Sequence, residues 1–369
     1  MPSALLAGHF GPSDAGESAT LGAFRRALPE WTPVLASSDP AATRAAHGCE
    51  TVDVRRPGAA VVVAARAEAT VLAGWSIGEE EDMRPGLQTA VALVSVAKLR
   101  RRRTALLGIS ARADRTPWEG RLSRRLLSRA DLVVLRDELS ARHLEAAGVP
   151  GPFRIGTDPA WLDLQDDRRP ARTTEPRPRR IVVAIEAHGC PPNLVARLGE
   201  ALGGLAAGGT EIALQPWHPA ASDGQDRTLL TELAGRIAAP VRVLPPLPHL
   251  GAGSAMTAGA GAVVALSSHA LIAAAAAGVP AVAVVREPAI ADLARRLDQP
   301  RVAADASAAE IAAAIGAALD HEPALPNAVE GQIATAEEGF RLLRILLSEG
   351  QSDEVAELSG LPLRRGPGA

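Results

Sequence analysis

Residues 262–285 constrain the fold more than any other stretch of this chain. The segment begins with a short apolar run containing two valines, continues with an alanine-rich stretch up to Gly278, and closes with an apolar run after Pro280. A buried strand, a helix with glycine at its C-terminal end, and a second buried strand account for this order. We therefore predict a β–α–β unit, which belongs in a parallel sheet covered by helices on both faces.

Three polar residues stand at the first strand–helix junction of this unit. Ser267, Ser268 and His269 follow the predicted strand at 262–266 and precede the predicted helix at 270–277. Ligands of open parallel sheets bind at the carboxyl ends of the strands, where helix N-termini favour anions. We predict a ligand site here. The simpler alternative is that a serine caps the helix and His269 is incidental.

Composition bounds the class of protein. The chain has 369 residues, 47% of them hydrophobic, and a net charge of -3, as expected for two domains with apolar cores. No charge-free run of about 20 apolar residues occurs, so we expect no integral membrane segment. Two distant cysteines and 2% aromatic residues give little support to structural zinc, disulfides or nucleic-acid binding. We expect a cytoplasmic protein, with peripheral association at the inner face of the membrane as the alternative.

The domain boundaries follow from changes in pattern along the chain. Short apolar runs alternate with helical patterns on both sides of a charged, proline-containing stretch. We predict an N-terminal α/β domain at 1–162, a linker at 163–180, a C-terminal α/β domain at 181–327, a C-terminal helix at 328–350 and a tail at 351–369. In the first domain, the valine-rich run at 59–65 is predicted to be a strand.

A glycine-containing loop follows the first predicted strand. Gly8, Gly11 and Gly16 permit close approach of a ligand to the backbone, and Asp14 and Glu17 lie at the mouth of the loop. The spacing does not fit a dinucleotide-binding fingerprint, and no phosphate-loop lysine follows. Nicotinamide cofactors are therefore not supported. A simple capped helix start is the alternative.

The segment after residue 130 carries a more specific pattern. Arg136, Asp137 and Ser140 form Arg-Asp-x-x-Ser where a predicted strand turns into a helix, and Asp158 follows in Thr-Asp-Pro. This block resembles the polysaccharide pyruvyl transferase family. The histidine block ending in Gly-Val-Pro at 278–280 matches that family too, as do the glycine loop and the strand end with Gly74 and Ser76.

The resemblance implies a fold and a reaction. The expected fold is a GT-B-like pair of doubly wound parallel-sheet α/β domains that face each other across a cleft. The expected reaction moves the enolpyruvyl group of phosphoenolpyruvate onto hydroxyls of a sugar in a cell-surface polysaccharide precursor, forming a ketal and releasing phosphate. No metal or organic cofactor is implied. His269 is the expected catalytic acid, because imidazole titrates near neutral pH.

The chain departs from the family where the family carries cations. Ser267 and Ala289 replace an arginine and a lysine, and a third cation position falls near Glu186 or Ala187. Arg286, expected at a strand end near the His269 junction, is a candidate replacement. Two alternatives follow: a nucleotide-sugar glycosyltransferase on the same architecture, or a catalytically inactive homologue that binds a glycan or a partner enzyme.

We expect Arg136 to face the cleft or to pair with Asp158, and a salt bridge to Asp137 or Glu138 is the alternative. His218 follows another predicted strand in Gln-Pro-Trp-His-Pro. The candidate substrate-binding residues are Gly8, Gly11, Asp14, Gly16, Glu17, Gly74, Ser76, Arg112, Arg136, Asp137, Ser140, Asp158, His218, Ser267, Ser268 and Arg286.

Overall fold

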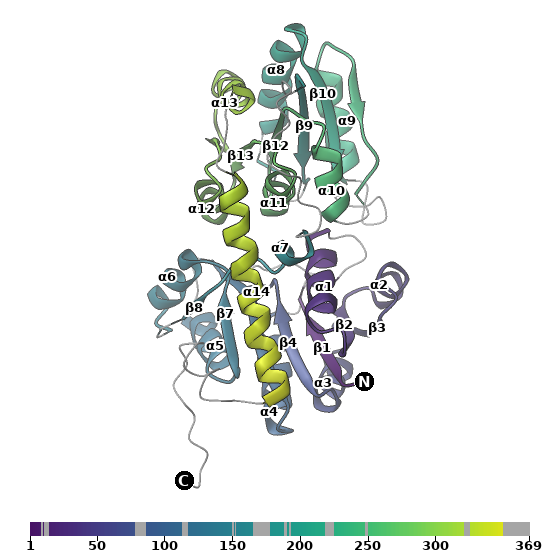
Figure 1. The fold of residues 1–369 in the computed structure, drawn as a ribbon, viewed down its shortest axis with the longest axis vertical. Coiled ribbons are helices and arrows are strands. Elements are labelled where there is room, and N and C mark those ends of the chain that lie inside the picture. Colours follow the sequence, from purple (N-terminus) through teal and green to yellow (C-terminus); the bar gives the residue numbers. More distant parts are fainter. Residues whose placement is uncertain are drawn as a thin grey trace. The chain divides into compact units, whose positions relative to one another are not determined.

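The chain folds into two compact units (Figure 1). The computed structural model describes residues 1–8, 10, 15–77, 86–112, 117–149, 151, 153–164, 178–187, 190, 191, 193–217, 225–247, 250–320 and 325–349. The first unit comprises residues 1–12, 17–163 and 332–369, and the second comprises residues 13–16 and 164–331. Each unit contains a parallel sheet, as predicted for a pair of doubly wound α/β domains.

The sheet of the first unit has the strand order β3-β2-β1-β4-β6-β7-β8, with β5 paired to β6. Its strands are β1 (Ser3–Ala7), β2 (Thr32–Ser37), β3 (Glu50–Asp53), β4 (Ala69–Ala73), β5 (Ser76–Ile77), β6 (Arg103–Ala111), β7 (Leu132–Leu135) and β8 (Arg154–Ile155). Leu5 and Leu6 are both 0% exposed although they point to opposite faces of the sheet. Both faces of this sheet are therefore covered, and continuous apolar runs form its central strands.

The helices of the first unit connect these strands. They are α1 (Ala15–Ala27), α2 (Pro40–His47), α3 (Pro57–Arg66), α4 (Leu87–Leu99), α5 (Pro117–Leu127), α6 (Glu138–Ala146) and α7 (Ala160–Asp163). Asp39 begins α2 by accepting a hydrogen bond from the Ala42 N–H, and Gly48 ends the helix with a φ of 65°. These are common start and stop signals of helices.

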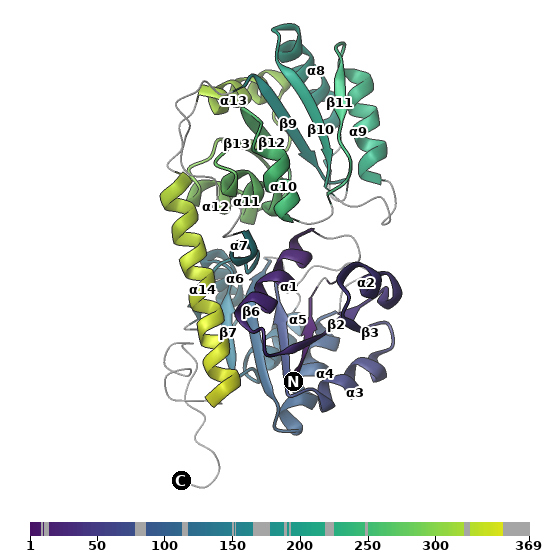
Figure 2. The same ribbon diagram turned by 45° about the vertical axis from the view of Figure 1, so that its right-hand side comes forward.

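The sheet of the second unit has the order β11-β10-β9-β12-β13-β14, and several of its strands face the viewer in Figure 2. The strands are β9 (Arg180–Ile185), β10 (Glu211–Pro216), β11 (Val241–Val243), β12 (Ala262–Ala265), β13 (Ala281–Val285) and β14 (Arg301–Ala303). The helices are α8 (Leu194–Ala207), α9 (Gln225–Arg236), α10 (Leu250–Thr257), α11 (Ser268–Ala276), α12 (Pro288–Arg296) and α13 (Ala308–Asp320).

Both sheets reverse their winding direction at corresponding points. The chain moves outward from β9 to β11 and then returns to the other side of β9 with β12, and the first sheet does the same between β1 and β4. Adjacent connections leave such a reversal on opposite sides of the sheet, and ligands commonly bind there. The β12–α11–β13 segment predicted from residues 262–285 thus starts at the reversal of the second sheet.

The alanine-rich composition of α11 explains its position. Seven of its nine residues are buried, because small side chains let the helix approach the sheet closely. Gly278 follows with a φ of 70°, a conformation that favours glycine, and the chain then enters β13. This local order confirms the predicted β–α–β unit.

The last helix, α14 (Leu325–Glu349), belongs to the first unit from residue 332 onward. Phe340, Leu343 and Leu346 are buried, and the Arg344 Nη2 donates to the Ala27 carbonyl oxygen at 2.8 Å. A Cβ at Gly339 would lie 3.1 Å from the Leu107 side chain, so the helix packs closely on β6. The helix predicted at 328–350 therefore supplies core residues to the first unit.

One predicted element was wrong. The valine-rich run at 59–65 forms most of α3 rather than a strand. Pro57 lies in the first turn, where its missing N–H costs nothing, and Ala60 and Ala64 are both 0% exposed one helical turn apart. Val62 is 47% exposed. This segment is therefore a helix because its small residues are spaced to pack on one helical face, although valine by itself favours strands.

In the part of the chain that the structure describes, no helix is both long and apolar enough to cross a membrane. Among the same residues, no three His, Cys, Asp or Glu side chains lie together in a group that could hold a metal ion.

Candidate functional site

His269 lies in the first turn of α11, at the carboxyl end of β12. Ser267 is the N-cap residue, and its Oγ accepts a hydrogen bond from the Ala270 N–H at 3.3 Å. Ser267 is buried, whereas Ser268 and His269 are partly exposed. The cap fixes the start of the helix. The imidazole thus stands beside the reversal point of the second sheet with part of its surface accessible.

The second unit also contains Gly16 by its contacts. A Cβ built on Gly16 would overlap the imidazole of His269. Glycine at this position therefore leaves the space that the histidine ring occupies. Glycine at position 16 is therefore explained by packing against His269, and the predicted close approach of substrate is not needed to explain it.

Arg286 crosses the ends of three adjacent strands. It follows β13, its Nε donates to the Leu266 carbonyl oxygen after β12 at 2.7 Å, and its Nη2 donates to Glu186 Oε2 after β9 at 3.1 Å. The Arg286 and Glu186 side chains are 16% and 15% exposed. The placement of Arg286 at the strand end near the His269 junction is confirmed. Its pairing with Glu186 was not foreseen.

The Cys190 thiol adds no charge to this edge at neutral pH. Burial raises the pKa of Cys190, and the positive charge of Arg286 opposes that shift only in part. Asp226 accepts a hydrogen bond from the Ala187 N–H at 2.7 Å and fixes the backbone after Glu186. The Glu186 side chain therefore extends from a backbone segment that is held in place.

The end of β10 is built mainly from internal contacts. The Gln215 Nε2 donates to the carbonyl oxygens of Pro216 and Pro245, each at 2.8 Å, and Gln215 and Trp217 are each 1% exposed. His218 lies outside the described residues, so its predicted contact with substrate stays a prediction. Gly11 and Asp14 of the first loop also lie outside them.

Arg136 joins strand ends at the carboxyl edge of the first sheet. Its Nη2 donates to the Gly74 carbonyl oxygen at 3.0 Å, its Nε to the Gly108 carbonyl oxygen at 3.4 Å, and the same Nε lies 3.7 Å from Asp158 Oδ2. The expected pairing with Asp158 is thus present. Gly108 has a φ of 63° and forms an irregularity in β6, and a Cβ there would overlap Pro159.

Asp137 and Ser140 of the Arg-Asp-x-x-Ser block are also engaged by the protein. Asp137 is the N-cap of α6 and accepts from the Ser140 N–H at 2.7 Å, while the Ser140 Oγ accepts from the Ala111 N–H at 3.1 Å. Both side chains are buried. The block therefore fixes the junction of β6, β7 and α6, and its predicted contact with substrate stays a prediction.

The other candidates of the first unit lie near the ends of its central strands. A Cβ at Gly8 would lie 2.6 Å from the Ala73 carbonyl oxygen, so glycine lets the ends of β1 and β4 approach. Gly74 has a φ of 63°, and Ser76 is buried in β5. Glu17 is buried in α1 and Arg112 is exposed after β6. Their substrate contacts remain predictions.

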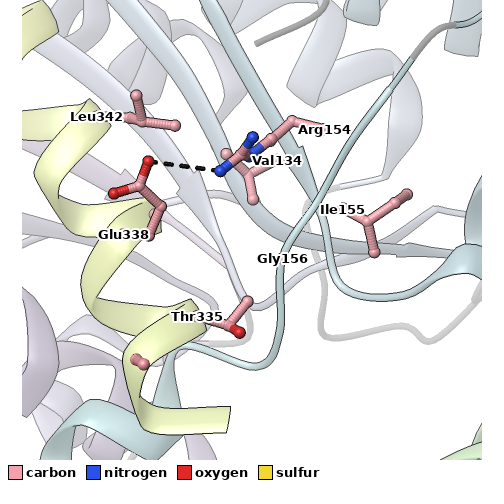
Figure 3. Close-up of a pocket in the computed structure, with 9 residues that line it drawn as sticks. Val134, Arg154, Ile155, Gly156, Thr335, Glu338 and Leu342 are labelled. Carbon is pink, nitrogen blue, oxygen red and sulfur yellow. Dashed lines mark hydrogen bonds and ion pairs between the residues drawn. The ribbon is translucent and has the colours of Figure 1, made fainter. Parts of the chain in front are cut away.

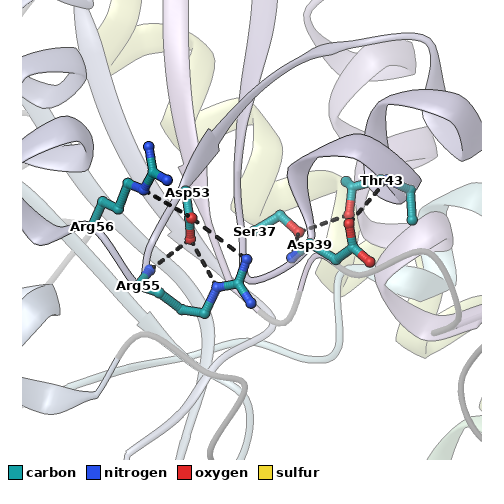
Figure 4. A network of polar contacts seen from close by, with 7 residues as sticks. Ser37, Asp39, Thr43, Asp53, Arg55 and Arg56 are labelled. Carbon is teal, nitrogen blue, oxygen red and sulfur yellow. Dashed lines mark hydrogen bonds and ion pairs between the residues drawn. The ribbon is translucent and has the colours of Figure 1, made fainter.

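A polar network that sequence reasoning missed lies at the ends of β2 and β3 (Figure 4). The Ser37 and Thr43 hydroxyls are 2.7 Å apart, and Asp53 pairs with Arg55 and Arg56 at 3.1 and 3.7 Å. The hydrogen bond from Arg55 lowers the pKa of Asp53. The sequence signal was Asp-Val-Arg-Arg, but it follows a strand that was itself not predicted.

A cavity of about 330 Å³ lies beside α14 in the first unit. Figure 3 shows Arg154 of β8 and Glu338 of α14 pointing toward each other, and their side chains are 3.4 Å apart. Val134, Thr335 and Leu342 are among the other residues that line it. Its lining includes no residue of the candidate site, so the cavity is a separate feature.

Known proteins resemble this chain in family and in fold. The family model described as "Polysaccharide pyruvyl transferase" matches residues 21–288. No curated protein matches the chain. A putative UDP-N-acetylglucosamine 2-epimerase from Listeria monocytogenes is similar in structure, with 12% identity, a TM-score of 0.65, and coverage of 98% of this chain and 99% of that one.

Two further solved structures have the same architecture. A UDP-GlcNAc 2-epimerase from Methanocaldococcus jannaschii, in complex with UDP-GlcNAc and UDP, has 12% identity, a TM-score of 0.62, and coverage of 94% and 99%. The spinosyn rhamnosyltransferase SpnG has 16% identity, a TM-score of 0.54, and coverage of 94% and 100%. At these identities the likeness shows the fold, which is the GT-B-like pair of parallel-sheet domains.

Proposed function

Because this chain belongs to the polysaccharide pyruvyl transferase family, we propose that it transfers the enolpyruvyl group of phosphoenolpyruvate to a sugar. The acceptor is a sugar of a cell-surface polysaccharide precursor, and the product is a cyclic ketal. The observation that carries the proposal is the position of His269, a partly exposed imidazole in the first turn of α11, beside the reversal point of the sheet.

The proposed reaction has a defined balance of bonds and protons. Two sugar hydroxyl oxygens bond to the central carbon of phosphoenolpyruvate, and the bond from that carbon to the phosphate oxygen breaks. The methylene carbon gains one proton and becomes a methyl group. The two hydroxyls together lose two protons, of which one replaces the proton given to the methylene and the other leaves with phosphate. The balance requires no metal ion, oxidant or organic cofactor.

His269 is proposed to protonate the methylene carbon. An imidazole can hold a proton near neutral pH and release it in the transition state. The Ser267 cap fixes the backbone from which this side chain extends, and the N-terminus of α11 favours an anionic group nearby. Together these features support an acid positioned beside the phosphate or carboxylate of the donor.

The test is substitution of His269 with alanine. His269→Ala is expected to lower the rate of acceptor-dependent phosphate release by about 10² to 10⁴, because general acid catalysis contributes on that order. The melting temperature should stay close to wild type, since the imidazole is partly exposed. His47→Ala is the matched control, because His47 is a partly exposed histidine of α2 that is not among the candidate site residues. A turnover rate of His269→Ala equal to wild type would contradict the acid role.

A second candidate function has its own support. Arg286 is paired with Glu186, so part of the positive charge at this edge is already neutralised, and solved structures with the same fold include a UDP-GlcNAc 2-epimerase in complex with UDP-GlcNAc. These facts favour a nucleotide-sugar glycosyltransferase or an inactive glycan-binding homologue. Thermal shifts with phosphoenolpyruvate, UDP-sugars and glycans compare the three. A shift with phosphoenolpyruvate and none with UDP-sugars supports pyruvyl transfer.

A second variant tests binding of phosphoenolpyruvate, the proposed donor. Ser267→Arg adds a cation beside His269 and removes the Ser267 cap, so it is compared with Ser267→Ala, which also lacks the cap. Relative to that variant, it is expected to strengthen phosphoenolpyruvate binding by about 1.5–3 kcal/mol if a charged hydrogen bond forms. If neither wild type nor Ser267→Arg binds phosphoenolpyruvate at millimolar concentration, the proposal of pyruvyl transfer is rejected.

We also propose a cytoplasmic location, or peripheral attachment at the inner face of the membrane, which cell fractionation tests.

A further inference from the structure

The Glu186–Arg286 ion pair has no part in the proton transfer described above. Its two side chains extend from the ends of β9 and β13, the two strands that flank β12 in the sheet. The guanidinium also holds the carbonyl oxygen of Leu266, the residue that precedes the Ser267 cap. The pair therefore spans the strand end that leads directly to His269.

The chemistry of the pair determines what else can bind Arg286. A guanidinium offers donors in a fixed planar arrangement that suits two oxygens of a carboxylate or phosphate. The Arg286 Nε is occupied by a backbone carbonyl, and the Nη2 faces a carboxylate at 3.1 Å. A phosphate approaching this guanidinium meets the negative charge of Glu186 at the same group.

Burial makes this competition stronger than at an open surface. Arg286 and Glu186 are 16% and 15% exposed, so water screens the repulsion between Glu186 and an arriving anion less than it would screen two fully exposed charges. An anion bound to Arg286 must displace the carboxylate or share the guanidinium with it. Either case lowers affinity for the anion.

We propose that Glu186 is a specificity-determining residue that competes with phosphate-bearing ligands for Arg286. The ligand class is phosphate monoesters and inorganic phosphate, which share the oxygen arrangement that Arg286 recognises. The inference rests on the proposed function in one respect, since phosphoenolpyruvate is such a monoester. Glu186 sets how weakly that donor binds at this edge.

The test removes the carboxylate charge and keeps the side-chain shape. Glu186→Gln is expected to bind inorganic phosphate about tenfold more tightly than wild type by calorimetry, the equivalent of one charged hydrogen bond. Glu211→Gln is the matched control, because Glu211 pairs with Arg180 at 3.0 Å where β10 and β9 begin, at the opposite edge of the same sheet. Its affinity for phosphate should equal that of wild type.

Adding Arg286→Gln to Glu186→Gln should remove the gain, which assigns it to the guanidinium. If Glu186→Gln does not fold, Glu186→Ala provides the same measurement. Phosphate affinity equal to wild type in a folded Glu186 variant overturns the inference.

The proposed function and the inference about Glu186 can be rejected independently of each other. A gain in phosphate affinity without turnover of phosphoenolpyruvate by any variant supports the inference and rejects pyruvyl transfer. Turnover of phosphoenolpyruvate by wild type, with no gain in phosphate affinity in Glu186→Gln, supports pyruvyl transfer and rejects the inference.

Discussion

Arg136 illustrates how one side chain can hold several strand ends together. Its guanidinium contacts the carbonyl oxygens of Gly74 and Gly108 and lies near Asp158, which is 4% exposed. Backbone carbonyls at strand ends need donors when water is excluded. Arginine supplies several donors from one planar group, so it satisfies acceptors on strands that are not adjacent in sequence.

Arg136→Ala is therefore expected to destabilise the first unit. The variant removes the Arg136 charge from beside Asp158 and leaves two carbonyl groups with fewer donors, which should lower the free energy of unfolding by about 2–3 kcal/mol. Urea unfolding measures the change. Arg142→Ala is the control, because Arg142 is 62% exposed in its pair with Glu138. Equal midpoints for Arg136→Ala and wild type would contradict the structural role.

At the scale of elements, α14 is held by charged contacts as well as by apolar packing. The hydrogen bond from Arg341 lowers the pKa of Glu338, burial opposes this shift, and Arg341 and Arg154 add favourable charge. A carboxyl whose pKa is lowered by folding stabilises the folded state at pH values above its ordinary value of 4.5. That contribution is lost as the pH falls through the lowered pKa.

Glu338→Gln should therefore reduce stability in a pH-dependent way. At about pH 6 the variant is expected to melt below wild type, and the difference should shrink progressively as the pH falls below 4.5, because the contribution of the Glu338 carboxylate is lost as the pH passes through its lowered pKa. Thermal melts across this pH range measure this. Glu330→Gln, at an exposed site on the same helix, is the control. A difference that grows toward acid pH contradicts the argument.

Elements with strong local signals were predicted from the sequence, and elements that depend on tertiary context were not. The strand predicted before Arg136 is the buried β7, and α11 follows β12 as the alanine-rich run predicted. The edge strand β3 was missed because of its four residues only Val52 is buried. For α3, valine suggested a strand, but the alanine face packs against the sheet as a helix.

The candidate site shows the same division. The position of His269 follows from local order, since a strand, a serine cap and a helix are contiguous in sequence. The Glu186–Arg286 pair joins residues 100 positions apart, and strand order alone brings their ends near β12. A single sequence gives no direct signal for such a contact.

At the scale of the whole molecule, the first unit needs segments from both sides of the second unit in sequence. A chain ending at residue 331 lacks the buried residues Phe340, Leu343 and Leu346. It is expected to expose apolar surface in the first unit, to bind a hydrophobic dye and to lose cooperative melting of that unit. Leu343→Ala should give a partial effect of about 2–5 kcal/mol. Wild-type melting of the truncated chain would contradict this view.

The first unit is divided between segments that precede and follow the second unit in sequence, which has a consequence for biosynthesis. Proteins usually complete their N-terminal domain first as they emerge from the ribosome. Here residues 164–331 are made before the last segment of the first unit, which includes most of α14. The second unit therefore has its complete sequence earlier, and the first unit waits, with its site for α14 uncovered, until the residues after 331 have been made.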